Sequence, residues 1–200
     1  ENIMPLGANK AAIMGVAGTA VTGDVVLLAT ETISEDATIS FTSDITSTYG
    51  EYIFKFYNIH PASDDKILTF QGSTDGGSNY NVTMTTTSFN AYHMEDDSAS
   101  ALQYSDSSDQ QQGTAYQRIS DTVGNAADQN IAGELHLFNP ASTTFVKHFI
   151  AHTSTDHHGE MMSDFRFAGY FNTTSAINAI SFKMNSGNMD AGKIKLWGVK

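Results

Sequence analysis

The chain has 200 residues, of which 40% are hydrophobic and only 16% are charged, and its formal net charge is −12. This acidic balance argues against binding to nucleic acid or to anionic membrane surfaces, because both kinds of binding depend on Lys and Arg. The lack of Cys excludes disulfides and thiolate catalysis, and no stretch reaches the roughly 18 continuous apolar residues of a membrane-spanning helix.

Residues 1–24 show no regular hydrophobic period and are interpreted as an extended N-terminal arm. Exposed apolar side chains on such an arm would be a liability for a monomer. The arm therefore either packs on its own domain or contacts a neighbouring subunit. The candidate residues for oligomer contact or attachment are Ile3, Met4, Leu6, Ile13 and Met14.

Residues 25–200 are predicted to form a single all-β domain, an antiparallel β-sandwich of jelly-roll-like type. Short β-rich runs alternate there with clusters of Gly, Asn, Asp and Ser, as is typical of sandwiches and barrels. Within one run, Phe54 and Phe56 share a face and are predicted to lie in the core. The runs cover residues 25–30, 37–41, 51–60, 66–72, 80–87, 115–123, 132–138, 144–152, 164–171, 176–184 and 193–199.

Three short turns are predicted to join adjacent antiparallel strands. The first lies at residues 73–79, where Asp-Gly-Gly supplies the positive φ of a tight hairpin between residues 66–72 and 80–87. The others lie at residues 139–142 and 186–188. Residues 95–113 are rich in Asp, Ser and Gln and are interpreted as one long polar loop.

The run at residues 144–152 has apolar side chains on both faces. Phe145, Lys147 and Phe149 share one face, whereas Val146, His148 and Ile150 share the other. This pattern indicates a strand that is partly covered on both sides, or one that takes part in an oligomer contact. With the apolar arm, it suggests more apolar surface than one core can bury and leads to the hypothesis of a homotrimer.

Two clusters contain the residue types of metal ligands. His157, His158 and Glu160 could serve a zinc or nickel ion, and Asp96 and Asp97 could serve a hard cation such as calcium. Adjacent His residues on a strand point apart, and the acidic spacing matches no EF-hand loop. Solvated polar loops explain both clusters better, so no metal and no cofactor is predicted.

The sequence carries few signs of catalysis or of sugar binding. The sequence contains no Gly-x-Ser-x-Gly elbow, Walker loop, dinucleotide fingerprint or His-Glu-x-x-His helix, which disfavours the common motif-bearing enzymes. A glycan-cleaving enzyme of jelly-roll type would need two close carboxylates. Aromatic side chains that could stack on sugars, if exposed, are Tyr80, Tyr92, Tyr104, Tyr116 and Trp197.

Six segments are distinctive as a set: EYIFKFYNIHP at 51–61, FQGSTDGGSNYNV at 70–82, GELHLFNP at 133–140, VKHFI at 146–150, AGYFNTTSA at 168–176 and GKIKLWGV at 192–199. Together they resemble an uncharacterised family of virion structural proteins from marine tailed phages of the cyanophage and pelagiphage kind. The likeness covers roughly residues 49–200 and does not include the first forty or so residues. It implies a location in a virion and supplies no active-site residues.

From these observations we expect a non-enzymatic phage structural protein on the particle surface, either decorating the capsid or forming a head or tail appendage. Its expected partners are other copies of itself and other virion proteins. The alternative is a carbohydrate-binding, receptor-binding sandwich of a tail fibre or secreted protein, with host surface glycans as partners.

Overall fold

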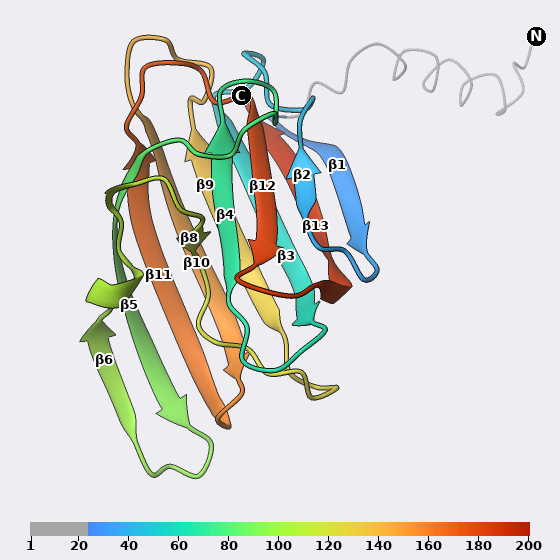
Figure 1. Cartoon of the computed structure of the whole chain (residues 1–200), viewed down its shortest axis with the longest axis vertical. Coiled ribbons are helices and arrows are strands. Elements are labelled where there is room, and N and C mark those ends of the chain that lie inside the picture. Colours follow the sequence, from blue (N-terminus) through green and yellow to red (C-terminus); the bar gives the residue numbers. More distant parts are fainter. Residues whose placement is uncertain (1–23) are drawn as a thin grey trace, which may run out of the picture.

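The computed structural model describes residues 24–200, which fold into two antiparallel β-sheets packed face to face (Figure 1). The predicted all-β antiparallel sandwich is therefore confirmed, while its jelly-roll character stays a prediction. The strands are β1 (Val25–Ile33), β2 (Ile39–Phe41), β3 (Glu51–Pro61), β4 (Leu68–Ser73), β5 (Met84–Met94), β6 (Ser100–Tyr104), β7 (Gln111–Gly113), β8 (Gln117–Arg118), β9 (Ile131–Phe138), β10 (Lys147–His157), β11 (Met161–Phe171), β12 (Ala179–Met184) and β13 (Met189–Val199).

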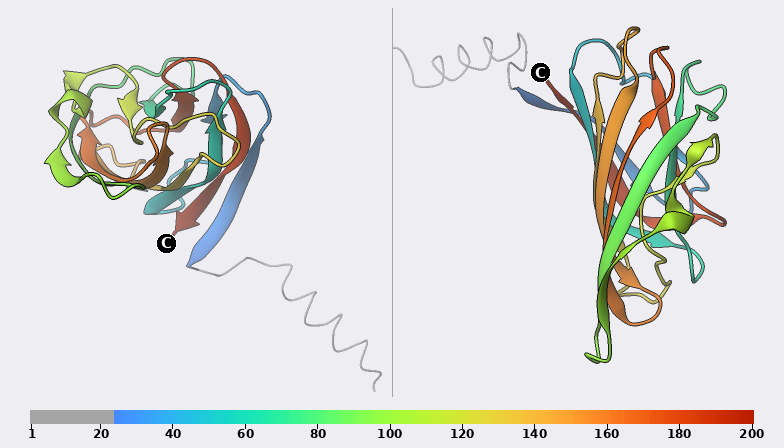
Figure 2. Two further views of the ribbon diagram at one scale, coloured as in Figure 1. Left: turned by 90° about the horizontal axis from the view of Figure 1, so that it is seen from below. Right: turned by 90° about the vertical axis from the view of Figure 1, so that its left-hand side faces the viewer.

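The two sheets differ greatly in width. The large sheet has nine strands in the order β1-β13-β3-β9-β10-β11-β5-β6, with β7 also paired to β5. The small sheet has four strands in the order β2-β12-β4-β8. Figure 1 shows the small sheet in front of the middle of the large one, with β1 beyond it at one side and β5 and β6 at the other. The end-on view in Figure 2 shows the same two layers.

An aromatic cluster between the sheets forms the centre of the core. Phe182 on β12 is fully buried, and its ring centroid lies 5.1 Å from that of Phe54 and 5.3 Å from that of Phe56, both on β3. The predicted core positions Phe54 and Phe56 are thus confirmed, at 0% and 2% exposure. Edge-to-face contacts of this kind add to the free energy of burial and tie the two sheets together.

The inner face of the large sheet near β5 is covered differently, by the segment around residues 105–123. Ser88 on β5 donates to Asp109 Oδ1 at 2.9 Å, and Ser163 on β11 donates to Asp121 Oδ2 at 2.7 Å. Asp121, which is 7% exposed, also accepts a hydrogen bond from Arg118. We call this set of buried hydrogen bonds the polar layer, because it occupies the place that aromatic rings fill farther along the sheet.

Several local predictions were wrong. The turn at residues 73–79 has positive φ at Gly76 and Gly77 as expected, but it carries the chain from the small sheet to the large one, so β4 and β5 do not form a hairpin. The turn at residues 186–188 likewise links β12 to β13 in different sheets. Of the three predicted turns, only the one at residues 139–142 joins strands that pair with each other, β9 and β10. A glycine-rich turn lets the chain reverse direction without deciding which sheet it enters.

The long polar loop predicted at residues 95–113 is also wrong. It contains β6, which pairs with β5, a short 3₁₀ turn at Asp106–Ser108, and β7. Conversely, the run predicted at residues 115–123 contributes only the two-residue strand β8. The sequence did not reveal β6, because four of its five residues are exposed and it lacks the buried apolar alternation of the other strands.

Candidate interaction face

The large sheet has an outer face, the side turned away from the small sheet, and this face gathers the exposed apolar side chains. Nine large hydrophobic residues are more than about 40% exposed among residues 24–200, and eight of them point outward from this one face. The ninth, Phe145, precedes β10. The eight are Val25, Leu27, Tyr57, Phe89, Leu102, Tyr104, Ile150 and Met162.

Strand register aligns outward side chains into rows that cross the sheet. One row is mainly apolar and runs over seven strands, because each residue is the direct partner of the next. Partners in directly opposed positions are close enough for their side chains to touch. The row consists of Leu27, Trp197, Ile53, His136, Ile150, Ala168 and Thr87.

The next row carries charges in its middle and aromatic rings at one end. It runs over eight strands, from β1 to β6, again through directly paired residues. Since the two rows are neighbours, charged groups lie directly beside the apolar row. The charged row consists of Thr30, Lys195, Lys55, Glu134, His152, Arg166, Phe89 and Tyr104.

Glu134 forms one cluster of paired charges on the face. Its carboxylate lies 3.1 Å from Lys55 Nζ and 3.2 Å from His136 Nε2. Burial alone would raise the pKa of Glu134, but the hydrogen bonds from His136 and Lys55 outweigh it, so the pKa lies below its ordinary value. His136 also lies 2.5 Å from Glu51 Oε1 through its Nδ1 atom, so the imidazole is held between two carboxylates.

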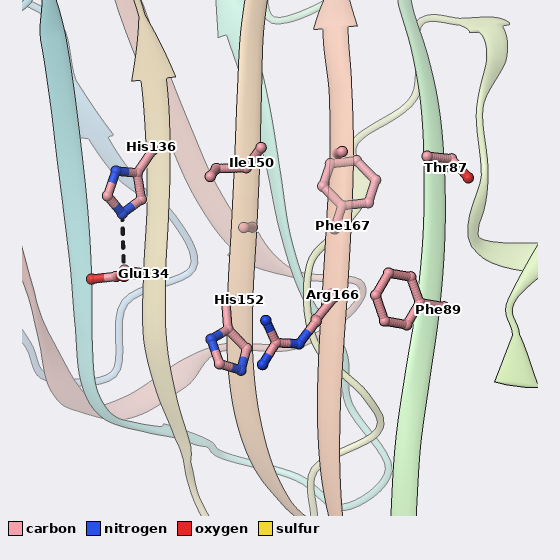
Figure 3. Close-up of a pocket in the computed structure, with 10 residues that line it drawn as sticks. Thr87, Phe89, Glu134, His136, Ile150, His152, Arg166 and Phe167 are labelled. Atoms are coloured by element: carbon pink, nitrogen blue, oxygen red, sulfur yellow. Dashed lines mark ion pairs between the residues drawn. The ribbon is translucent and has the colours of Figure 1, made fainter. Parts of the chain in front are cut away.

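Asp164 on β11 forms a second cluster. Its Oδ1 atom lies 2.5 Å from His152 Nε2, and its Oδ2 atom accepts from Arg166 Nη2 at 3.2 Å. Figure 3 shows the side chain of Arg166 pointing toward His152, with the ring of Phe89 on the other side of β11. These residues line a shallow hollow of about 350 Å³ that also reaches His136 and Ile150. The hollow is open to solvent and combines an aromatic ring with charged hydrogen-bonding groups.

The outer face is close to electrically balanced although the molecule is not. Its outward charged side chains are four basic residues and five acidic ones, which gives a net charge of −1 with His neutral. The whole chain carries −12, so most of its excess negative charge lies elsewhere. The basic residues are Lys55, Arg166, Lys193 and Lys195, and the acidic residues are Glu51, Glu134, Asp156, Asp164 and Asp190.

The candidate metal ligands at the β10–β11 turn do not converge on one point. His157 and His158 stack with their ring centroids 4.3 Å apart, and His157 Nδ1 accepts a hydrogen bond from Gly159 N at 2.9 Å. Burial lowers the pKa of His157. Glu160 adopts a positive φ of 56° at the turn, where its N–H donates to His157 O.

The second candidate cluster forms the turn between β5 and β6. Asp96 Oδ1 accepts from Ser98 N at 3.0 Å, and Asp97 lies 3.1 Å from His93 Nε2. The hydrogen bonds from Ser98 lower the pKa of Asp96. Within residues 24–200, no group of three or more His, Cys, Asp or Glu side chains is placed to hold a metal ion.

The structure separates the five aromatic candidates for sugar stacking. Tyr104 and Trp197 belong to the two rows of the outer face. Tyr80 and Tyr116 pack against each other instead, with their ring centroids 6.4 Å apart. Tyr92 lies three residues after the outward-pointing Phe89 on β5, so its side chain is on the inner side of the sheet. Phe89 itself was missed, because alternation within β5 does not show which of its faces stays uncovered.

The arm residues Ile3, Met4, Leu6, Ile13 and Met14 lie outside the described residues, so their predicted role in oligomer contact or attachment stays a prediction. In the part of the chain that the structure describes, no helix is long and apolar enough to cross a membrane.

Comparison with known proteins gives little further information. No family model matches the chain, and no curated protein matches it. Among solved structures, one match is described as the structure of infectious bursal disease virus Gx strain, with 13% sequence identity and a TM-score of 0.12. It covers 88% of this chain, which spans only 39% of that chain's length. Similarity at this level supports no argument about function, and the resemblance to phage virion proteins stays a prediction.

Proposed function

We propose that this chain is a non-enzymatic structural protein of a bacteriophage virion, exposed at the particle surface as a capsid decoration or as a head or tail appendage. The observation that carries the proposal is the outer face, where eight of the nine exposed large hydrophobic residues gather on one side of one sheet. A rigid sandwich with one broad apolar face is suited to protein contact.

The physical argument rests on the cost of exposed apolar surface. Single exposed apolar residues are normal on a monomer, but a contiguous apolar surface rimmed by polar groups marks a site of interaction. Leu27, Trp197 and Ile53 are directly paired in one such row, and Ile150 lies beyond His136 in the same row. The resemblance of residues 49–200 to phage virion proteins supplies the setting, and the outer face supplies a surface for assembly, for which we retain a homotrimer.

The proposal is tested by cryo-electron microscopy of intact particles combined with immunogold labelling of this chain. Density on the capsid lattice would support a decorating role, and density at a tail or fibre would support an appendage. If purified particles of a phage that encodes the chain contain none of it by mass spectrometry, the proposal is wrong.

Carbohydrate binding is the second candidate, and the hollow in Figure 3 favours it specifically. Phe89 is 45% exposed and offers a ring face for a sugar, while Arg166 and His152 offer polar hydrogen-bond partners in the same hollow, across β11 from the ring. A glycan array probed with residues 24–200 should then give hits that Phe89→Ala abolishes and Phe145→Ala, on the exposed residue before β10, leaves intact. An array without hits would contradict this candidate.

A further inference from the structure

Opposite charges are separated across the outer face. Lys193 and Lys195 on β13 and Lys55 on β3 point outward on neighbouring strands, and we call these three the basic strip. Glu134, Asp156 and Asp164 point outward from β9, β10 and β11, and we call these three the acidic strip. Figure 1 shows β13 and β3 toward one side of the large sheet and β10 and β11 toward the other.

The separation persists when every outward Lys, Arg, Asp and Glu is counted. On β13 and β3, three lysines, Glu51 and Asp190 give a net charge of +1. On β9, β10 and β11, three acids and Arg166 give a net charge of −2. The outward residues of β1, β5 and β6 carry no formal charge with His neutral. The face therefore has a net charge of only −1, and its positive and negative charges lie mainly on different strands.

This arrangement matters because the rest of the molecule is strongly acidic. The outer face has a net charge of only −1 and offers its apolar row, whereas the rest of the chain carries most of the −12 and so favours repulsion between copies. Complementary potentials select a partner and orient it more than they add to raw affinity. The partner that matches a positive strip beside a negative strip is a second copy of the same face, turned so that unlike strips meet.

We propose that copies of this chain associate through their outer faces, with the basic strip of one copy against the acidic strip of the next and with the apolar row excluded from water between them. The inference deepens the proposed function, because it names the contact through which copies assemble. It rests on the proposed virion role only for the biological reason why the copies assemble. Self-association is measured in solution without the particle, so its failure and the failure of the virion role are distinguishable.

The test compares charge-reversed variants of the full chain by sedimentation equilibrium. Lys55→Glu with Lys195→Glu, and separately Glu134→Lys with Asp164→Lys, should each weaken self-association about tenfold or more. The fourfold variant that carries all these changes restores both the complementarity between copies and the Lys55–Glu134 pair within one copy. It should therefore associate about as well as the unmodified chain.

A matched control separates the strips from net charge. Lys66→Glu with Lys183→Glu makes the same change in net charge at positions off the outer face, and its association should resemble that of the unmodified chain. Circular dichroism checks that each variant is folded, and the fourfold variant still decides the question if one double variant is not. A monomeric unmodified chain at 100 µM, or a fourfold variant that stays dissociated while folded, would overturn the inference.

Discussion

Replacement of Phe182 by Ala should test the aromatic cluster between the sheets. Burial of a Phe side chain contributes about 2.5 kcal/mol. Edge-to-face contacts of Phe182 with Phe41, Phe54 and Phe56 add about 0.5 kcal/mol each. The free energy of unfolding should therefore fall by about 4 kcal/mol, within the range for large-to-small core substitutions. Native domains have only about 5–15 kcal/mol in total, so the variant should be close to unfolding.

The assay is urea unfolding followed by the fluorescence of Trp197, the only Trp of the chain. Trp197 points outward from β13, so it lies on the opposite side of the large sheet from the cavity that Phe182→Ala would create. The matched control is Phe145→Ala, because Phe145 is 70% exposed and its loss should change the free energy of unfolding by less than about 0.5 kcal/mol. A loss below about 1.5 kcal/mol for Phe182→Ala, or equal losses for the two variants, would refute the reasoning.

Three further outcomes are expected. Asp121→Ala should lower the free energy of unfolding by about 3 kcal/mol, because it leaves Arg118 and Ser163 without their acceptor, and an unchanged urea midpoint would contradict this. Hydrogen bonds from Asn79 and Ser73 lower the pKa of Asp75 to about 2. The stabilisation of that turn is therefore present above about pH 4 and lost as the pH falls toward 2. Carboxyl NMR should report this value, and a pKa near 3.8 would speak against it. Deletion of residues 1–23 should leave the melting temperature within a few degrees but abolish incorporation into particles; normal incorporation would remove the arm from the attachment role.

Most strands could be predicted because their side chains alternate, but their sheet partners could not. The two-residue period of residues 51–60 correctly placed Phe54 and Phe56 in the core. The same period says nothing about which strand lies next to which. The glycine-rich turn at residues 73–79 illustrates this, since the local chemistry of a hairpin turn and of a crossing between sheets is the same.

The sequence indicated that a second contact surface exists, but it did not show which residues form it. Apolar residues on both sides of residues 144–152 indicated a second contact surface, and Ile150 does point outward in the structure. The rows themselves depend on the register of seven or eight strands, several of which are distant in sequence. The alternating pattern placed Lys147 on the same face as Phe149 but did not predict its burial. In the structure Lys147 is buried, with Nζ donating to the carbonyl oxygens of Phe145 and Thr173.

The polar layer gives the two ends of the large sheet different resistance to local opening. On its inner face, strand β3 packs through Phe54 and Phe56 against Phe182, whereas β5 is held by side-chain hydrogen bonds such as those of Ser88 and Asn90. Water can replace a hydrogen bond more readily than it can replace packed rings. Amide hydrogens of β5 and β6 should therefore exchange with solvent earlier than those of β3. One continuous sheet would then open rarely around β3 and more often at β5 and β6. A partner bound at the β6 end would slow amide hydrogen exchange most in β5 and β6.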